Sequence, residues 1–339
     1  MILSRTPYRI SFFGGGTDYP VWYREHGGAV ISTTIDKYCY ISCRYLPPFF
    51  EHKHRIVYSK SEEVIDISEI KHPAVREAFN FMKITQGLEI HHDGDLPART
   101  GLGSSSSFTV GLLKCLYALR GEMVTRQRLT KDALYVEQEM IKENVGSQDQ
   151  TAAAYGGFNK ISFHQNGSIT VSPIIMPADK LRSFQKHIML YFTGFSRYAS
   201  EIAGEQIKKT AEKKTEINTM YQMVAEGLSI LGRAERDIVE FGKLLHESWM
   251  IKRNLTDKIT TPYVDEIYEE ARRGGAIGGK LIGAGGGGFI ILFVKPQDQP
   301  EVRQRLKKLL QVPFRFDNSG SQIVVYQPNL SYCVDDVCQ

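Results

Sequence analysis

A short loop near the middle of the sequence combines glycines and serines in a pattern that suits phosphate binding. Residues 97–107 read Pro-Ala-Arg-Thr-Gly-Leu-Gly-Ser-Ser-Ser-Ser and precede a helical pattern at residues 108–119. Glycines allow a tight bend, and a helix N-terminus offers N–H groups and a positive dipole end to an anion. Serine is also a common N-cap, but four in succession exceed what capping needs. The residues expected to bind phosphate are Pro97, Arg99, Thr100, Gly101, Leu102, Gly103, Ser104, Ser105, Ser106 and Ser107.

Two further glycine-rich segments resemble nucleotide-binding motifs, but their context argues against both. Residues 274–281 have the spacing of a Walker loop, yet the last position is Leu281. That position needs a hydroxyl to hold Mg²⁺, so the match fails on chemistry. Residues 283–288 fit G-x-G-x-x-G but lead into an apolar strand at residues 289–294. A dinucleotide fold needs a helix after this motif, so we expect neither type of site.

The composition is that of a soluble globular protein without a nucleic-acid or membrane partner. The 339 residues are 42% hydrophobic and 24% charged, with a net charge of +4. The chain has no block of Lys and Arg, no apolar run approaching a membrane span and no signal-peptide core at its start. Five cysteines without a C-x-x-C pair indicate free thiols in a reducing compartment. We expect a cytoplasmic protein, and the sequence does not specify its oligomeric state.

The predicted elements mix strands and helices without a regular alternation, which favours an α+β fold over a Rossmann or TIM architecture. A proline-containing segment at residues 173–179 is the best candidate for a domain boundary. Strands are expected at residues 9–13, 30–35, 39–45, 55–58, 88–91, 158–163, 168–175, 187–192, 289–294, 314–316 and 322–326. Helices are expected at residues 74–86, 105–119, 131–143, 151–155, 200–231, 235–252, 262–273 and 299–310.

Three motifs occur in a fixed order along nearly the whole chain. They are residues 7–19 (Pro-Tyr-Arg-Ile-Ser-Phe-Phe-Gly-Gly-Gly-Thr-Asp-Tyr), the Gly-Leu-Gly-Ser-Ser loop, and residues 280–288. Together they resemble the GHMP small-molecule kinases, the family of galactose, homoserine, mevalonate and phosphomevalonate kinases. The resemblance implies ATP and Mg²⁺ as cofactors. It also implies an N-terminal domain at residues 1–175 with a ribosomal-protein-like βαβ core, and a ferredoxin-like C-terminal domain at residues 176–339.

Within that family the chain is most similar to the bacterial D-glycero-D-manno-heptose 7-phosphate kinases, with fucokinases close by. The resemblance is carried by Phe-Phe-Gly-Gly-Gly-Thr-Asp at residues 12–18, by residues 146–150 and by residues 155–157. It implies phosphorylation of the anomeric C1 hydroxyl, on the way to nucleotide-activated heptose for surface glycans. Arg99 departs from the family pattern, where many members have Gly, and it adds a cation beside the phosphate loop. A kinase of fucose or galactose and a non-catalytic ATP- and sugar-binding sensor remain the alternatives.

The same resemblance assigns the groups that phosphoryl transfer requires. It makes Asp149 the carboxylate that faces the acceptor hydroxyl, and Arg9 the cation beside it. Without the resemblance, Asp149 could merely cap a helix, and Arg9 could form a surface salt bridge on an edge strand. The resemblance implies that Ser105 and Glu137 bind Mg²⁺, with Glu139 as the alternative to Glu137. Hard oxygen ligands are what Mg²⁺ prefers, although a helix carboxylate can equally be a solvated side chain.

The acceptor site is expected to form around Asp18, whose carboxylate suits vicinal sugar hydroxyls. A phosphorylated acceptor also needs a remote anion pocket, best made by Arg. Arg197 is the first candidate for that pocket, although it could equally be a solvated cation on a loop. The further candidates are Lys37, Lys252 and Arg253. The residues expected to contact the acceptor are Gly15, Gly16, Thr17, Asp18, Gly157, Arg197, Gly285 and Gly286.

Overall fold

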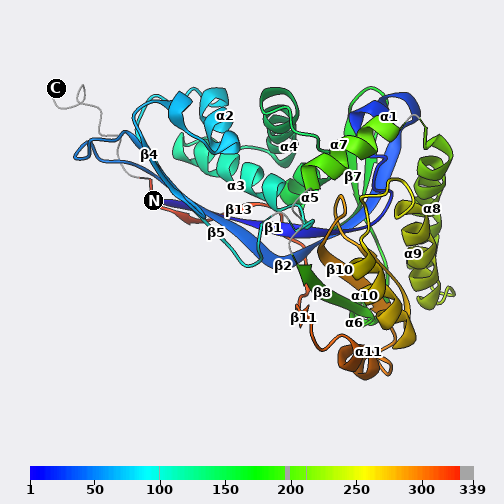
Figure 1. The fold of residues 1–339 in the computed structure, drawn as a ribbon. Coiled ribbons are helices and arrows are strands. Elements are labelled where there is room, and N and C mark those ends of the chain that lie inside the picture. The colour runs from blue at the N-terminus through cyan, green and yellow to red at the C-terminus, as the bar shows by residue number, and fades with distance from the viewer. Residues whose placement is uncertain (99, 195–198, 211, 329–339) are drawn as a thin grey trace.

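A computed structural model describes residues 1–98, 100–194, 199–210 and 212–328, and Figure 1 shows two β-sheets with helices packed on them. Within these residues, the large sheet has nine strands, in the order β13-β1-β2-β5-β3-β4, with β6 and β12 paired to β2 and β7 paired to β6. The small sheet has the strand order β11-β8-β10-β9. The sheets are antiparallel except for the parallel pair β3 and β5, and their combination with helices confirms the predicted α+β class.

The central strands of the large sheet carry the first sequence motif. β1 (Ile2–Phe13) pairs antiparallel with β2 (Gly28–Tyr45) along most of its length. The sequence predicts two strands in place of β2, but Tyr38, in the expected gap, still pairs with Pro7. The other strands of this sheet are β3 (His54–Val57), β4 (Ser61–Val64), β5 (Leu88–Gly94), β6 (Phe158–Phe163), β7 (Ile169–Pro173), β12 (Phe316–Asp317) and β13 (Gln322–Tyr326).

Helices cover one face of the large sheet and position the predicted phosphate loop. α3 (Ser104–Leu119) packs on both β1 and β2 and is buried on nearly all sides, which explains its continuous apolar sequence. A π-helical turn at Tyr135–Met140 leads on from α4, where the sequence predicts one regular helix. The remaining helices of this face are α2 (Pro73–Phe81), α4 (Arg126–Leu134) and α5 (Gln148–Tyr155), seen around α3 in Figure 1.

The small sheet packs against helices of the second half of the chain. α9 (Val239–Lys252) and α10 (Pro262–Arg273) both contact β9 (Ala276–Leu281). β9 was not predicted from the sequence, because glycines are unfavourable in the interior of a strand. A methyl group at Gly278 would lie 1.9 Å from the Gly242 carbonyl oxygen of α9, so this strand needs glycine where the helix comes close. The other elements are β8 (Ile188–Gly194), β10 (Gly288–Val294), β11 (Leu310–Gln311) and α11 (Gln299–Arg305).

Several predicted helices differ in number or extent. The helix predicted over residues 200–231 is two helices, α7 (Ala199–Lys209) and α8 (Lys214–Gly232). Two short helices, α1 (Pro20–His26) and α6 (Ala178–Lys186), were not predicted. The predicted start of α10 is confirmed, because the Thr261 side chain caps it by accepting from the Val264 N–H at 3.2 Å.

The last two strands return to the large sheet, since β13 pairs with β1 and β12 pairs with β2. The boundary expected between residues 175 and 176 stays a prediction. Three of the cysteines, Cys39, Cys43 and Cys115, are buried free thiols, whereas Cys333 and Cys338 lie outside the described residues. Among the helices that the structure describes, none has the length and apolarity to cross a membrane.

Candidate active site

The predicted phosphate loop is a tight bend that ends at the N-terminus of α3. Gly101 and Gly103 have φ angles of +87° and +75°, a region that favours glycine. Gly103 is the N-cap residue, and no side chain caps the helix there. A helix start without a side-chain cap is suited to an anion, so the local backbone agrees with the predicted chemistry.

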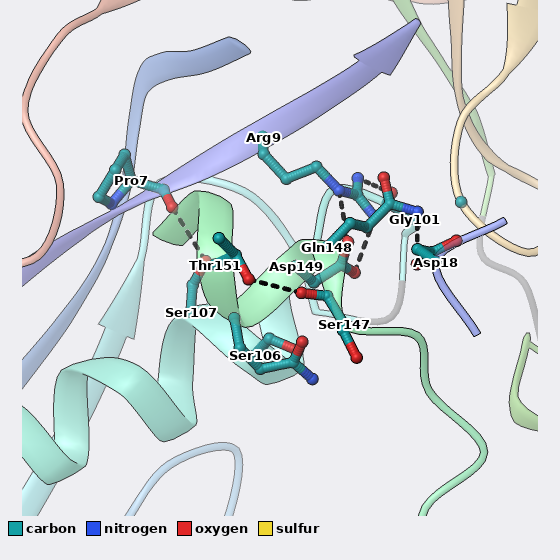
Figure 2. A network of polar contacts seen from close by, with 12 residues as sticks. Pro7, Arg9, Asp18, Gly101, Ser106, Ser107, Ser147, Gln148, Asp149 and Thr151 are labelled. Atoms are coloured by element: carbon teal, nitrogen blue, oxygen red, sulfur yellow. Dashed lines mark hydrogen bonds and ion pairs between the residues drawn. The ribbon is translucent and has the colours of Figure 1, made fainter. Parts of the chain in front are cut away.

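The four serines of this loop serve different contacts. Ser105 is exposed and, with Ser104 and Ser106, lines a cavity beside the loop. The Ser106 hydroxyl also donates to the Glu137 carboxylate at 2.9 Å. The Ser107 hydroxyl points the other way and donates to the Pro7 carbonyl at 2.9 Å, so it joins α3 to β1 (Figure 2).

Three other residues of the predicted loop shape it rather than face the cavity. The Thr100 hydroxyl donates to the Pro97 carbonyl oxygen at 2.8 Å, and Thr100 is fully buried. Leu102 is 1% exposed and belongs to the hydrophobic core. These contacts hold the bend in place, and among the described residues of the loop the cavity is lined by Gly101 and by the segment from Gly103 to Ser106.

Arg9 and Asp149 form a bidentate ion pair at the floor of the cavity. The Arg9 Nε and Nη2 atoms donate to the two Asp149 carboxylate oxygens at 2.7 Å each, and Arg9 Nη1 donates to the Gly101 carbonyl at 2.6 Å (Figure 2). The Arg9 side chain is only 5% exposed and lies on an interior strand, so it is not a surface salt bridge. Asp149 lies in the first turn of α5, but its carboxylate is held by Arg9 instead of capping the helix. The pair therefore fixes one carboxylate next to the phosphate loop.

Asp18 is a second, almost fully buried carboxylate in the same cavity. It accepts from the Gly16 N–H at 3.0 Å and from the Gln148 side-chain amide at 2.9 Å. Burial raises the pKa of Asp18, and the neighbouring Asp149 charge raises it further. A methyl group at Gly146 would lie 1.9 Å from an Asp18 oxygen, which explains why the Gly146–Gln150 segment begins with glycine.

The turn before Asp18 brings backbone into the cavity. Gly15 and Gly16 line the cavity, as predicted residues of the acceptor site. Thr17 does not, because its hydroxyl donates to the carbonyl oxygens of Gly14 and Ala29 and so holds the turn against β2.

Glu137 is buried on the π-helical turn beside the serine loop. One of its oxygens accepts from Ser106 and from the Gln150 side chain, whereas the other has no hydrogen-bond partner within the described residues. Burial raises the pKa of Glu137 to about 7. An unpartnered buried carboxylate oxygen near serine hydroxyls fits the hard oxygen ligands that Mg²⁺ takes. The alternative, Glu139, is exposed to solvent.

The C-terminal glycine tract packs against the phosphate loop. A methyl group at Gly283 would lie 2.4 Å from the Gly101 Cα, and one at Gly288 would lie 2.3 Å from the Thr100 carbonyl oxygen. Gly285 and Gly286, both predicted to contact the acceptor, lie instead against Ile259, whose carbonyl accepts from the Gly286 N–H at 2.9 Å.

Three predicted positions contribute little to this cavity or lie outside the description. Gly157 is bonded to Thr34, with its N–H donating to the Thr34 hydroxyl at 2.7 Å, and it does not line the cavity. Arg99 and Arg197 lie outside the described residues.

The structure also adds residues that the sequence analysis missed or ranked low. Lys280 lies within two of the glycine-rich motifs but was not predicted as a site residue, and Lys252 was a secondary candidate, yet both are buried and line the cavity. Glu143, Asn144 and Gln206 line it as well, and nothing in their local sequence marks them.

The cavity has a volume of about 320 Å³. It lies where α3, α5 and β1 meet the glycine tract, and it accommodates a ligand of sugar size. Its lining residues are Arg9, Ser11, Gly15, Gly16, Asp18, Tyr19, Gly101, Gly103, Ser104, Ser105, Ser106, Glu143, Asn144, Val145, Gly146, Gln148, Asp149, Ala203, Gln206, Lys252, Lys280, Gly283 and Ala284.

Comparison with known families matches both halves of the chain. Residues 69–157 match the GHMP kinases N-terminal domain, and residues 228–311 match the GHMP kinases C-terminal domain. The first match contains the phosphate loop, Glu137 and Asp149, while the second contains Lys252 and the glycine tract.

Individual relatives extend over most of the chain. The D-glycero-alpha-D-manno-heptose 7-phosphate kinase of Campylobacter jejuni is 26% identical over 322 residues, which cover 91% of this chain and 93% of the relative. The galactokinase of Pyrococcus furiosus is 25% identical and covers 86% of this chain and 89% of the relative. The crystal structure of a D-glycero-D-manno-heptose 1-phosphate kinase from Bacteroides thetaiotaomicron superposes with a TM-score of 0.71 at 23% identity, covering 96% of this chain and all of the other.

Proposed function

Because this chain belongs to the GHMP kinases and is an ATP-dependent sugar kinase, we propose that its acceptor is D-glycero-D-manno-heptose 7-phosphate. In the proposed reaction the anomeric C1 hydroxyl attacks the γ-phosphorus of ATP. A new O1–P bond forms, the bond from the γ-phosphorus to the bridging oxygen breaks, and ADP leaves. The product is the 1,7-bisphosphate, a precursor of nucleotide-activated heptose for surface glycans.

The observation that carries the proposal is the ion pair of Arg9 and Asp149 beside the phosphate loop. A methyl group at Gly103 would lie 3.4 Å from an Asp149 oxygen and 3.3 Å from the Arg9 side chain. This closeness of the carboxylate to the start of α3 supports a reacting hydroxyl that lies between Asp149 and the terminal phosphate. Asp149 orients that hydroxyl and accepts its proton, while Arg9 keeps the carboxylate in one position.

The remaining groups divide between the two substrates. The start of α3, from Gly103 to Ser106, binds the triphosphate through its backbone N–H groups and hydroxyls. Asp18 and the backbone of Gly15 and Gly16 bind sugar hydroxyls, because carboxylate and carbonyl oxygens accept from them. Arg99 and Arg197 remain proposed contacts of phosphate groups.

Ser105 and Glu137 would hold Mg²⁺, which when bound neutralises charge on the phosphates. The unpartnered Glu137 oxygen supports this assignment. The raised pKa of Glu137 adds a condition, since only the ionised carboxylate binds a cation well.

The proposal is tested by measuring ADP release with purified protein, ATP, Mg²⁺ and a panel of sugars. The panel contains D-glycero-D-manno-heptose 7-phosphate, the free heptose, L-fucose and D-galactose. Turnover that is highest with the heptose 7-phosphate and a product phosphorylated at C1 support the proposal. Faster turnover of fucose or galactose would show that the proposed acceptor is wrong. ATP binding without turnover of any sugar would indicate a non-catalytic sensor.

A further inference from the structure

Two buried lysines lie together on the side of the cavity formed by the second half of the chain. Lys252 is the last residue of α9 and is 5% exposed, and Lys280 lies on β9 and is 2% exposed. Both line the cavity. Among the described residues, neither forms an ion pair with a carboxylate. Buried charges are normally paired, so two unpaired ammonium groups beside a cavity indicate an anionic ligand.

The protein contacts of these lysines leave part of their hydrogen-bonding capacity unused. The Lys280 ammonium donates to the Phe12 carbonyl oxygen at 2.9 Å, and Lys252 donates to the carbonyl oxygens of Gly283 and Leu281. Each ammonium has three donors, so neither set is complete. The Ser11 hydroxyl lines the same cavity from β1, next to the Phe12 residue that Lys280 contacts, and has no hydrogen-bond partner within the described residues.

The carboxylates that line the cavity form no ion pair with either lysine among the described residues, although the Asp18 charge offsets part of their positive charge. Arg9 is compensated by Asp149, and Asp18 accepts from Gly16 and Gln148. Burial and, to a lesser extent, the Arg9 charge lower the pKa of Lys252 to about 8. Burial, Lys252 and Arg9 together hold the pKa of Lys280 well below its ordinary value. A bound dianion would relieve this repulsion.

The pair lies on the acceptor side of the cavity. The Asp18 charge raises the pKa of both lysines, which indicates that they lie near the carboxylate proposed to bind sugar hydroxyls. The Phe12 carbonyl that Lys280 contacts directly precedes the turn that carries Asp18. The triphosphate is expected at the start of α3, so the lysines are placed to meet the acceptor.

The other cations suggested for a remote phosphate are engaged elsewhere or lie outside the description. Lys37 contacts Asp36 at 3.4 Å, and Arg253 contacts Asp265 at 3.1 Å. Neither lines the cavity.

We propose that Lys252 and Lys280, with the Ser11 hydroxyl, form a second anion subsite that binds the phosphate ester carried by the acceptor. The inference rests on the proposed sugar-kinase function and specifies how the site selects a phosphorylated sugar over a neutral one. Lysine is suited to this role because its ammonium is a point charge that can share one phosphate with a second lysine.

The test compares matched acceptors in variants that remove each charge. Lys252→Met, Lys280→Met and the double variant are assayed with D-glycero-D-manno-heptose 7-phosphate and with the free heptose at saturating ATP. Each single variant should lower kcat/KM for the phosphorylated acceptor by roughly 10- to 100-fold, the range of a charged hydrogen bond. The free heptose should lose less than about threefold, because it has no phosphate to bind.

Lys114→Met is the matched control, since Lys114 also donates to a backbone carbonyl, that of Val124, but lies outside the cavity. This variant should leave kcat/KM unchanged for both acceptors. Equal losses on both acceptors in the cavity variants would overturn the subsite, because they would indicate a role in transfer or folding.

Affinity measurements on the wild-type protein provide a second test, which does not depend on whether the variants fold. Calorimetric titration without ATP should show the heptose 7-phosphate binding at least tenfold more tightly than the free heptose. Equal affinity would overturn the subsite even if both sugars are phosphorylated. Tight, lysine-dependent binding of the sugar phosphate without turnover would instead overturn the proposed kinase reaction and retain the subsite.

Discussion

The two walls of the cavity handle charge in different ways. The first wall consists of β1, residues 101–119, the π-helical turn and α5, and its cation Arg9 is held by two short hydrogen bonds to Asp149. The second wall consists of α9, β9 and residues 282–288, and its cations Lys252 and Lys280 donate only to carbonyl oxygens among the described residues. The cation of the first wall therefore has its ionic partner before any ligand binds, whereas we propose that those of the second wall gain theirs from an anionic ligand.

In the proposed reaction, this difference separates the groups that take part in phosphoryl transfer from the groups that select the substrate. A carboxylate that orients a hydroxyl must be held in one place in advance, because misplacement costs rate. A charged group that recognises a substrate gains most when its only strong partner is that substrate. The buried lysines reduce the stability of the free protein, and an anionic ligand would restore it.

The largest expected effect comes from breaking the first wall. Asp149→Asn should lower kcat by roughly 10²- to 10⁴-fold on every acceptor, because the amide neither accepts the proton nor balances Arg9. ATP affinity, measured by titration calorimetry, should stay near the wild-type value. Wild-type turnover in this variant would reduce Asp149 to a structural partner of Arg9. A loss of kcat with the phosphorylated acceptor alone would mean that Asp149, like the lysines, acts in substrate selection, so the two walls would not differ in role.

The contact between the two walls is tested at Gly101. A methyl group there would lie 2.3 Å from the Ile282 carbonyl oxygen, so Gly101→Ala should force the walls apart. We expect a loss of about 2–4 kcal/mol in the free energy of unfolding from the clash and the positive φ angle. Gly121→Ala is the control, since Gly121 has a φ of +72° but no atom within 4 Å of the added methyl. Urea unfolding should show a larger loss of unfolding free energy for Gly101→Ala than for Gly121→Ala. Equal losses would mean that the contact between the walls yields to the added methyl group.

The residues that bind Mg²⁺ can be assigned with four alanine variants of the first wall. Ser105→Ala and Glu137→Ala should each raise the Mg²⁺ concentration needed for half-maximal rate by roughly 10- to 100-fold and lower kcat. Glu139→Ala should leave the Mg²⁺ titration unchanged, because that side chain is exposed. A defect in Ser106→Ala that is absent from Ser105→Ala would transfer the ligand to the hydroxyl that contacts Glu137.

The smallest expected effect is a pH-dependent change in stability at Glu137, the uncompensated charge of the first wall. Its pKa is raised to about 7 in the folded protein, from an ordinary value of 4.5. The unfolded chain therefore releases this proton at lower pH, so stability falls as pH rises from about 4.5 to 7. Glu137→Gln should exceed the wild type by about 1–3 kcal/mol in the free energy of unfolding at pH 8, without Mg²⁺, and by little at pH 4. A difference that does not grow with pH would show that Glu137 is not buried as a charge.

Local patterns were sufficient for the phosphate loop and for much of the fold. Gly101, Gly103 and the serines that follow need only a bend and a helix start, and both are properties of neighbouring residues. The same holds for the Thr261 cap of α10 and for the β6–β7 hairpin at Asn166–Gly167. The motif resemblance added Arg9 and Asp149, which are 140 residues apart in sequence.

Tertiary structure decided what each charge meets. Lys280 reads as part of a glycine-rich loop, but β9 and α9 bury it next to Lys252 because only glycines at positions such as Gly278 allow the helix so close. Glu137 and Glu139 are two residues apart, and the π-helical turn buries the first and exposes the second. Burial and distance set the energy of a charge, and both depend on segments that are remote in the sequence. The sequence by itself therefore determined which groups are present, and packing decided which of them are paired, exposed or left for a ligand.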